Sequence, residues 1–266
     1  MSGHAVSDNM NNIINKSNSP DDMMILNEGE RIDDLQRCGL RIIQDKSKFC
    51  FGIDAVLLSG FAIVKKGEKH LDLCSGNGII PILLSGKTNG QSFSGIEIQE
   101  DCVLLAQRSV CLNGIEDRVD IVCGDIKNID KYFEKSSMNV VTCNPPYMPA
   151  GHAIKNPDSP KALARHEITC DFDDVAKAAA SMLKIGGRFY LVHRPFRLVE
   201  IFNTLTKYKL EPKRMKMVHP YIGHEANMVL IEAVYGGKPS IIVEKPIIVY
   251  ESENKYTQEI YDIYGY

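Results

Sequence analysis

The chain has 266 residues, of which 44% are hydrophobic and 24% are charged, and its formal net charge is −3 at pH 7. This composition is ordinary for a globular protein, and it lacks both the basic excess of most nucleic-acid-binding proteins and the apolar run of roughly 18 residues that a membrane span needs. The Asn- and Ser-rich start has no basic region followed by an apolar segment, so we expect no secretory signal and a cytoplasmic protein.

The sequence predicts one structured domain behind an irregular start. Residues 1–27 are polar and aperiodic, and we expect them to be disordered. Residues 28–266 are predicted to form a single domain, with a covering segment at 28–66, a core at 67–237 and a tail at 238–266. The covering segment holds a predicted strand at 40–44 and the start of a helix at 54–58. The Tyr-rich end of the tail, 251–266, is either a docked helix or loose.

Strands and helices alternate through the core. Strands are predicted at 70–74, 93–98, 119–123, 139–143 and 188–192, and helices at 78–85, 99–113, 173–184 and 196–208. Gly114 ends the second of these helices, and Gly186 with Gly187 is expected to stop the third. Only a loop separates the last strands, 215–218 and 228–234, which indicates an antiparallel hairpin. The pattern predicts an α/β fold with a doubly wound, seven-stranded, mostly parallel sheet and an antiparallel edge hairpin.

The turn after the first core strand is rich in glycine. It reads Asp72-Leu73-Cys74-Ser75-Gly76-Asn77-Gly78. Ligands of open α/β sheets bind at the carboxyl ends of the strands, and glycine lets the backbone approach a ligand closely because no Cβ intervenes. The third glycine of the dinucleotide fingerprint is replaced by Pro81, and no phosphate-binding lysine follows, so neither NAD nor ATP is favoured.

Two carboxylates follow the next two strands. Glu97 is placed to accept hydrogen bonds from both hydroxyls of a ribose, and Asp125 to accept one from the amino group of an adenine. A single carboxylate at a strand end is more often a helix cap than a ligand-binding group. Together with the glycine turn, however, the two acids describe a pocket for an adenosyl group. S-adenosylmethionine fits this pocket because it carries ribose and adenine but no phosphate.

The fourth strand leads directly into Asn144, Pro145, Pro146 and Tyr147. An amino nitrogen on a planar ring is a poor nucleophile, since its lone pair delocalises into the ring. The Asn144 side-chain oxygen and the Pro145 carbonyl can each accept one N–H and draw this nitrogen toward a pyramidal shape. The prolines stiffen the loop, and Tyr147 can stack on the ring. The string therefore predicts methyl transfer to a planar amino group. The competing interpretation is that Asn-Pro-Pro forms only a rigid turn.

With these residues the chain resembles the S-adenosylmethionine-dependent amino-methyltransferases and, among them, the bacterial tRNA (adenine-N6) methyltransferases that modify adenine 37 of a valine tRNA. Residues 51–58, 164–168 and 256–261 also resemble segments of that family, so the similarity covers about 28–266. It implies that the anticodon loop of a tRNA is the substrate and that no obligate protein partner is needed. The implied cofactor-binding residues are Asp72, Gly76, Asn77, Gly78, Glu97, Asp125 and Asn144, and the implied catalytic residues are Asn144, Pro145, Pro146 and Tyr147.

Three other functions share parts of this pattern. Protein glutamine-N5 methyltransferases, which act on release factors, have the same Asn-Pro-Pro-Tyr string but carry a helical N-terminal domain that residues 1–66 are too short to match. DNA adenine-N6 methyltransferases normally add a region that reads sequence, and here only the two dozen residues after Tyr147 are extra. A non-catalytic cofactor-binding module is the third alternative, and an intact Asn144 argues against it.

Basic and sulfur-containing residues leave further alternatives open. A cluster of basic residues is either a solvated edge or a phosphate-contacting patch: Lys207, Lys209, Lys213, Arg214 and Lys216. Basic residues after Tyr147 either contact the tRNA backbone or belong to an ordinary surface loop, in which Arg165 and His166 would be structural: His152, Lys155, Lys161, Arg165 and His166. The eight cysteines include no Cys-x-x-Cys pair, so we expect buried reduced thiols and neither disulfides nor a metal site.

Overall fold

The computed structural model describes residues 26–47, 50–145 and 170–265. The predicted disordered extension, 1–27, lies outside the described residues except for its last two. Pro146 and Tyr147, and all five basic candidates between 152 and 166, also lie outside them.

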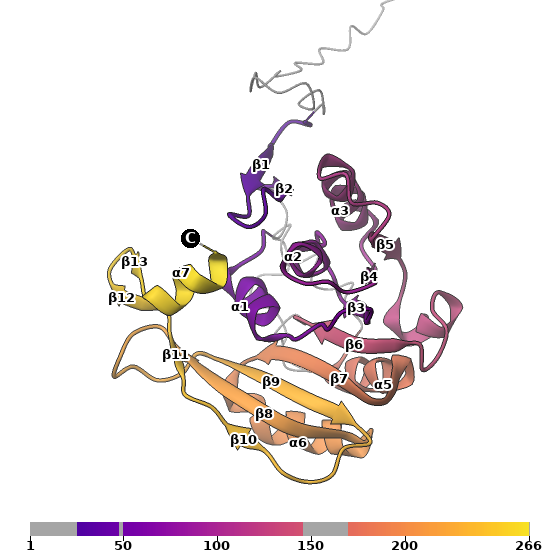
Figure 1. Cartoon of the computed structure of the whole chain (residues 1–266), viewed down its shortest axis with the longest axis vertical. Helices are drawn as coiled ribbons and strands as arrows, with labels where there is room; N and C mark the ends of the chain where they lie inside the picture. Colours follow the sequence, from indigo (N-terminus) through magenta and orange to yellow (C-terminus); the bar gives the residue numbers. More distant parts are fainter. Residues whose placement is uncertain (1–25, 48–49, 146–169, 266) are drawn as a thin grey trace, which may run out of the picture.

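The centre of the fold is one sheet with the order β8-β9-β7-β6-β3-β4-β5 (Figure 1). Its strands are β3 (Lys69–Leu73), β4 (Ser92–Glu97), β5 (Val119–Cys123), β6 (Met138–Cys143), β7 (Leu183–His193), β8 (Leu210–His219) and β9 (Met228–Tyr235). The neighbouring strands β5, β4, β3, β6 and β7 are parallel to one another, whereas β9 runs antiparallel to both β7 and β8. The predicted fold class and the predicted hairpin are therefore confirmed. Two short strands, β10 (Ile242–Val243) and β11 (Ile247–Ile248), pair with β8, so the described sheet has nine strands and not seven.

Helices cover both faces of this sheet. They are α1 (Ile53–Phe61), α2 (Ile79–Lys87), α3 (Glu100–Leu112), α5 (Phe172–Met182) and α6 (Leu198–Lys207), with short turns η1 (Ile126–Lys131) and η2 (Pro195–Arg197). The first three lie on one face of the sheet, and α5 and α6 lie on the other (Figure 1). Neighbouring residues of a strand point to opposite faces, so Val140 packs in the first of these layers and Val141 in the second. Both side chains are fully buried, as expected for the centre of a parallel sheet.

The end of α5 corrects one prediction. This helix ends at Met182 and not at the two glycines, because Leu183 is already extended and begins β7. Gly186 and Gly187 lie inside β7, where the pairing with β6 shifts register. Gly186 has φ +80°, which glycine adopts without strain, and a Cβ on Gly187 would lie 2.8 Å from the Lys184 carbonyl oxygen. The glycines therefore allow an irregular strand and do not cap a helix.

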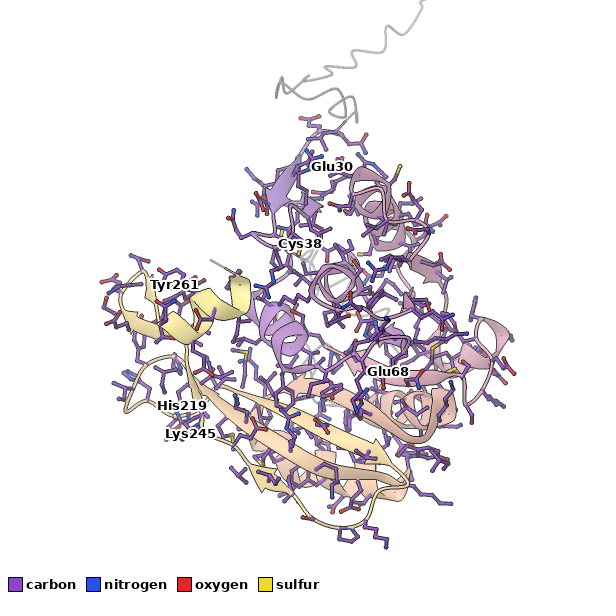
Figure 2. The ribbon with its side chains drawn as sticks, viewed as in Figure 1. Glu30, Cys38, Glu68, His219, Lys245 and Tyr261 are labelled. Carbon is purple, nitrogen blue, oxygen red and sulfur yellow. The ribbon has the colours of Figure 1, made fainter. Side chains whose placement is uncertain are left out.

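The covering segment forms a hairpin that is attached to α3. Its strands are β1 (Glu30–Asp34) and β2 (Arg41–Asp45). The main-chain N–H of Ile43 donates to Ser109 Oγ at 2.9 Å. Glu30, at the start of the hairpin (Figure 2), forms a two-pronged ion pair with Arg108 at 2.7 and 2.9 Å. These contacts fix the hairpin beside the helix that follows the second core strand.

The tail is docked, which decides between the two alternatives for it. It forms β12 (Tyr250–Ser252), β13 (Lys255–Tyr256) and α7 (Gln258–Tyr264), and α7 lies beside α1 (Figure 1). Ile260 on α7 is fully buried. The Tyr256 ring stacks on Tyr250 and on Tyr264, with ring centroids 5.2 and 5.9 Å apart. No helix among the described residues is long and apolar enough to cross a bilayer.

The basic cluster near β8 is largely neutralised. Arg214 lies 2.5 Å from both Glu232 and Glu244, and Lys207 lies 2.6 Å from Asp173. Lys216 also lies 3.5 Å from Glu244. Three of the five cations are thus held in structural ion pairs, which argues against an open patch for phosphates, while Lys213 Nζ donates to the Lys238 carbonyl at 3.1 Å.

All eight cysteines are free thiols, but the expectation of burial holds for only some of them. Cys102 and Cys143 are buried, whereas Cys38, Cys111 and Cys123 are exposed. Three or more His, Cys, Asp or Glu side chains gather nowhere in the described ranges in a way that would hold a metal ion.

Candidate active site

Strand register brings the predicted site residues to one edge of the sheet. A row of directly paired residues crosses four neighbouring strands: Cys143, Leu73, Ile96 and Val122. Asn144, Cys74 and Glu97 each come directly after a member of this row, so they leave the sheet side by side. Figure 2 labels one residue at each end of the strands. Glu68 comes just before β3, where the parallel strands begin, and His219 is the last residue of β8, at the carboxyl ends. The site is at the carboxyl edge, as expected for an open α/β sheet.

The glycine turn is fastened to the neighbouring strand β4. The Ser75 N–H donates to the Ile96 carbonyl at 3.0 Å, and the Gly76 N–H donates to Glu97 Oε2 at 2.9 Å. Gly76 has φ +55°, and apart from its chain neighbours no described residue has an atom within 4 Å of the position that a Cβ would take there. With no Cβ on the glycine, a ligand can approach the backbone of the turn closely.

Glu97 is held in place while it keeps capacity to bind a ligand. Its side chain is buried, and its second oxygen, Oε1, accepts from the Gln99 N–H at 3.0 Å. Gln99 Nε2 also donates to Oε1, at 3.3 Å. A carboxylate has about four lone-pair sites, so one ribose hydroxyl can donate to the open site and a second can replace the long bond from the Gln99 side chain. The main-chain contacts therefore orient Glu97 for the role predicted for it.

Asp125 caps a short helix, which was the alternative to its predicted role in binding the adenine amino group. Its Oδ1 accepts from the Lys127 N–H at 2.9 Å and so caps the short helix η1. Lys127 Nζ lies 3.8 Å from Oδ2. Asp125 follows β5, the strand beyond Glu97, and this places it at the outer end of the same edge.

Asp72 lies beneath the turn in a network of side-chain hydrogen bonds. Thr142 Oγ1 donates to Asp72 Oδ1 at 2.5 Å, and His70 Nε2 lies 2.8 Å from the same Thr142 oxygen. Burial raises the pKa of the Asp72 carboxyl to about 7, although the hydrogen bond from Thr142 opposes this shift. Burial also lowers the pKa of His70 to about 3, so its imidazole is neutral.

Thr142 and His70 were not among the site residues predicted from the sequence. One signal was available: His70 and Asp72 are two residues apart on a strand, and Thr142 is two residues before Asn144. The alternation of side chains puts such residues on the same face as each other. The contact itself depends on β6 lying next to β3, which local sequence does not reveal.

One buried amide in the turn fits an adenosyl cofactor. Asn77 is 8% exposed, and its Nδ2 has no hydrogen-bond partner among the described residues. An unsatisfied buried donor is costly, and the carboxylate, hydroxyl and ring-nitrogen acceptors of S-adenosylmethionine can satisfy it. Together with the space over Gly76 and the oriented Glu97, this edge of the sheet suits the predicted cofactor.

Two of the four predicted catalytic residues are described. Asn144 is half-buried and Pro145 is buried, and both follow β6 directly. The prediction for Pro146 and Tyr147 cannot be compared with the fold, since both lie outside the described residues.

Comparison with known proteins identifies the family of the chain. Residues 64–233, which contain every described site residue, match a family model described as "Methyltransferase domain". The chain belongs to the methyltransferase domain family. The predicted enzyme class, an S-adenosylmethionine-dependent methyltransferase, is confirmed, and S-adenosylmethionine is its cofactor.

Solved structures and curated relatives agree with this membership. A predicted O-methyltransferase of Agrobacterium tumefaciens has the same fold, with a TM-score of 0.65 at 18% identity over 79% of this methyltransferase and 95% of that chain. Among curated relatives, the tRNA1(Val) (adenine(37)-N6)-methyltransferase of Phocaeicola vulgatus is 25% identical over 218 residues, which cover 82% of this chain and 90% of the relative. The protein with the same description from Tolumonas auensis is 25% identical over 219 residues, 82% and 89% of the two chains. The resemblance predicted from the motifs is thus confirmed.

Proposed function

We propose that this methyltransferase transfers a methyl group to N6 of adenine 37 in a valine tRNA. The observation that carries the proposal is the position of Asn144 and Pro145. They follow Cys143, which pairs with Leu73, and Leu73 leads directly into the cofactor turn. Two oxygen acceptors suited to an amino group thus come next to the place where the methyl donor is expected.

The proposed chemistry needs few groups from the chain. The cofactor supplies an electrophilic methyl group on a sulfonium. The Asn144 side-chain oxygen and the Pro145 carbonyl accept the two N–H groups of the adenine and turn the nitrogen lone pair toward the methyl group. The rings of Pro145 and Pro146 fix φ and stiffen this segment, which orients the acceptors before the reaction begins. No strong base is required before methyl transfer, because the leaving group is a neutral thioether, and alignment provides most of the rate gain.

The choice of tRNA as substrate is supported by the curated relatives. The first two described above align over about nine-tenths of their own length, so the similarity is not confined to the cofactor half. We place the target in the anticodon loop, where a base is already easy to unstack. We further propose that the enzyme acts in the cytoplasm, that residues 28–266 form one domain, and that it needs no obligate protein partner. The cofactor is assigned to Asp72, Gly76, Asn77, Gly78, Glu97, Asp125 and Asn144.

Product analysis distinguishes the possible substrates. Purified protein is incubated with labelled S-adenosylmethionine and tRNA from a strain that lacks the gene, and the labelled nucleosides are separated. We expect N6-methyladenosine, and we expect it in a valine tRNA at position 37. Parallel reactions contain release factors or duplex DNA in place of tRNA. Label only in protein would support glutamine methylation, and label only in DNA would support a DNA adenine methyltransferase, so either result would contradict the proposal.

An exposed phenylalanine at the same edge is a candidate contact for the RNA. Phe196 is 73% exposed and lies in η2, directly after the carboxyl end of β7. Stacking of a base on an aromatic side chain contributes about 1–3 kcal/mol by alanine substitution. Phe196→Ala is therefore expected to raise KM for tRNA about 5- to 100-fold with little change in the Kd of S-adenosylmethionine.

Ile185 provides the matched control for this substitution. It is 79% exposed and lies near the start of β7, at the opposite edge of the sheet. Steady-state kinetics should show Ile185→Ala unchanged. Equal effects of the two substitutions would remove Phe196 from the RNA contact.

A further inference from the structure

Three polar side chains form a relay in the buried interior of the sheet. Asp72 and Thr142 are directly paired residues of β3 and β6, and His70 lies two residues before Asp72 on the same face of β3. Asp72 is 1% exposed, and Thr142 and His70 are fully buried. Polar groups are costly at such positions unless they are hydrogen-bonded. Their retention beneath the cofactor turn therefore suggests a role beyond packing.

The hydrogen bonds of this relay can point in two directions, and the two arrangements differ in free energy. Ionised Asp72 accepts the Thr142 hydroxyl proton, and Thr142 Oγ1 then accepts from the Nε2–H of His70. His70 Nδ1 is in that case a bare acceptor, and it has no partner among the described residues. A proton on Oδ1 of Asp72 would reverse both hydrogen bonds, and the neutral imidazole would carry its proton on Nδ1 as a buried donor without a partner among the described residues. Since orphaned donors are rarer in native structures than under-satisfied acceptors, the relay favours an unprotonated Oδ1, as in ionised Asp72.

Taken together, the other groups around Asp72 do not favour its ionised form. Among the described residues, the groups that face it are Ser75 from the turn, Glu97 from the end of β4, and Thr142 and His70 from the two central strands. The hydrogen bond from Thr142 stabilises the charged form, whereas burial and the negative charge of Glu97 oppose it. None of the four is cationic, because His70 is neutral. A positive charge from a ligand would therefore complete this site.

We propose that Thr142 and His70 are positioning residues that keep Asp72 ionised and oriented to receive the ammonium group of S-adenosylmethionine. The inference rests on the proposed role of Asp72 in binding the cofactor. The ammonium is the cationic group of the cofactor that can donate hydrogen bonds to a carboxylate, whereas the sulfonium carries no N–H or O–H. Thr142 and His70 touch neither cofactor nor substrate and act only through Asp72.

The test measures cofactor binding alone, by calorimetry from pH 6 to pH 8.5, with wild type, Thr142→Val and Thr142→Ser. Valine keeps the shape of threonine but removes the hydroxyl, which raises the pKa of Asp72 further. If the pKa of Asp72 rises by one unit from about 7, the affinity of the valine variant should be about fivefold lower at pH 7 and nearly tenfold lower at pH 6, and it should approach the wild-type value toward pH 8.5. The ratio of the two Kd values at each pH cancels the titration of the ligand itself. Serine restores the hydroxyl and should restore the wild-type profile.

A second substitution tests the outer step of the relay. His70→Val leaves the hydroxyl of Thr142 intact but removes the donor behind it, so we expect a smaller shift of the pH profile in the same direction. Thermal unfolding of each variant without cofactor verifies that it is folded. A loss of affinity in the valine variant that is independent of pH, or equal in the serine variant, would overturn the proposal, as would an unchanged profile. Since no tRNA is present, a wrong acceptor substrate would leave all these results intact.

Discussion

Replacement of Asn144 by alanine is expected to lower kcat for tRNA methylation by about 10²- to 10³-fold, in line with the loss of one preorganised hydrogen-bonding group in an active site. The variant loses one of the two oxygen acceptors that hold the amino group, so the nitrogen lone pair is no longer directed at the methyl group. The Kd of S-adenosylmethionine should change only a few-fold, because Asp72, Glu97 and the glycine turn remain. Single-turnover kinetics with tRNA, together with calorimetry for the cofactor, measure the two effects separately.

Asn139 offers the matched control on the same strand. It lies at the opposite end of β6, where its Oδ1 accepts from the Lys69 N–H at 3.1 Å. Asn139→Ala removes the same chemical group far from the site and should leave kcat unchanged. If Asn144→Ala keeps activity within a few-fold of wild type, then Asn144 does not hold the target. If the variant instead binds the cofactor far more weakly, then Asn144 contributes mainly to cofactor binding.

Elements that are determined by local pattern were predicted well. The strand predicted at 119–123 coincides with β5, and the antiparallel hairpin of β8 and β9 follows from the short connection between two apolar runs. The predicted end of α5 was wrong because a Gly-Gly pair can serve either as a helix stop or as a strand irregularity. Sheet pairing decides between the two uses, and Met138 pairs with Leu183 before the glycines are reached. Tertiary contacts thus overrode a local signal.

The candidate site was predictable to the extent that it depends on strand ends. Glu97 and Asn144 could be placed at one edge because parallel strands all finish there. The relay of His70, Thr142 and Asp72 could not, since 70 residues separate Asp72 from Thr142. Their contact requires that the fourth core strand lies beside the first, whereas β4 and β5 extend the sheet on the other side of β3. Sequence patterns indicate that a strand is buried, but its neighbours are fixed by topology.

Asp72→Asn should stabilise the protein without cofactor, and increasingly so at higher pH. The pKa of Asp72 is raised from 3.8 to about 7 in the fold by burial, so ionisation of this group opposes folding. Its contribution to stability is fully present below about pH 4 and is lost as pH rises toward 7. At 1.36 kcal/mol per pKa unit, the advantage of the neutral variant should grow from about 2 kcal/mol near pH 5 to about 4 kcal/mol near pH 8. Urea unfolding at both pH values measures it.

The same substitution should have the opposite effect when the cofactor is present. Saturating S-adenosylmethionine stabilises wild type by mass action, and the asparagine variant should lose most of this gain because it offers no negative charge to the ammonium. Asp120→Asn, an exposed position on β5, is the control and should alter neither the pH dependence nor the cofactor effect. Equal stability of wild type and Asp72→Asn at pH 8 would show that Asp72 is not strained by its burial. If both effects are observed, the buried carboxylate of Asp72 serves to bind the cofactor and lowers the stability of the free protein.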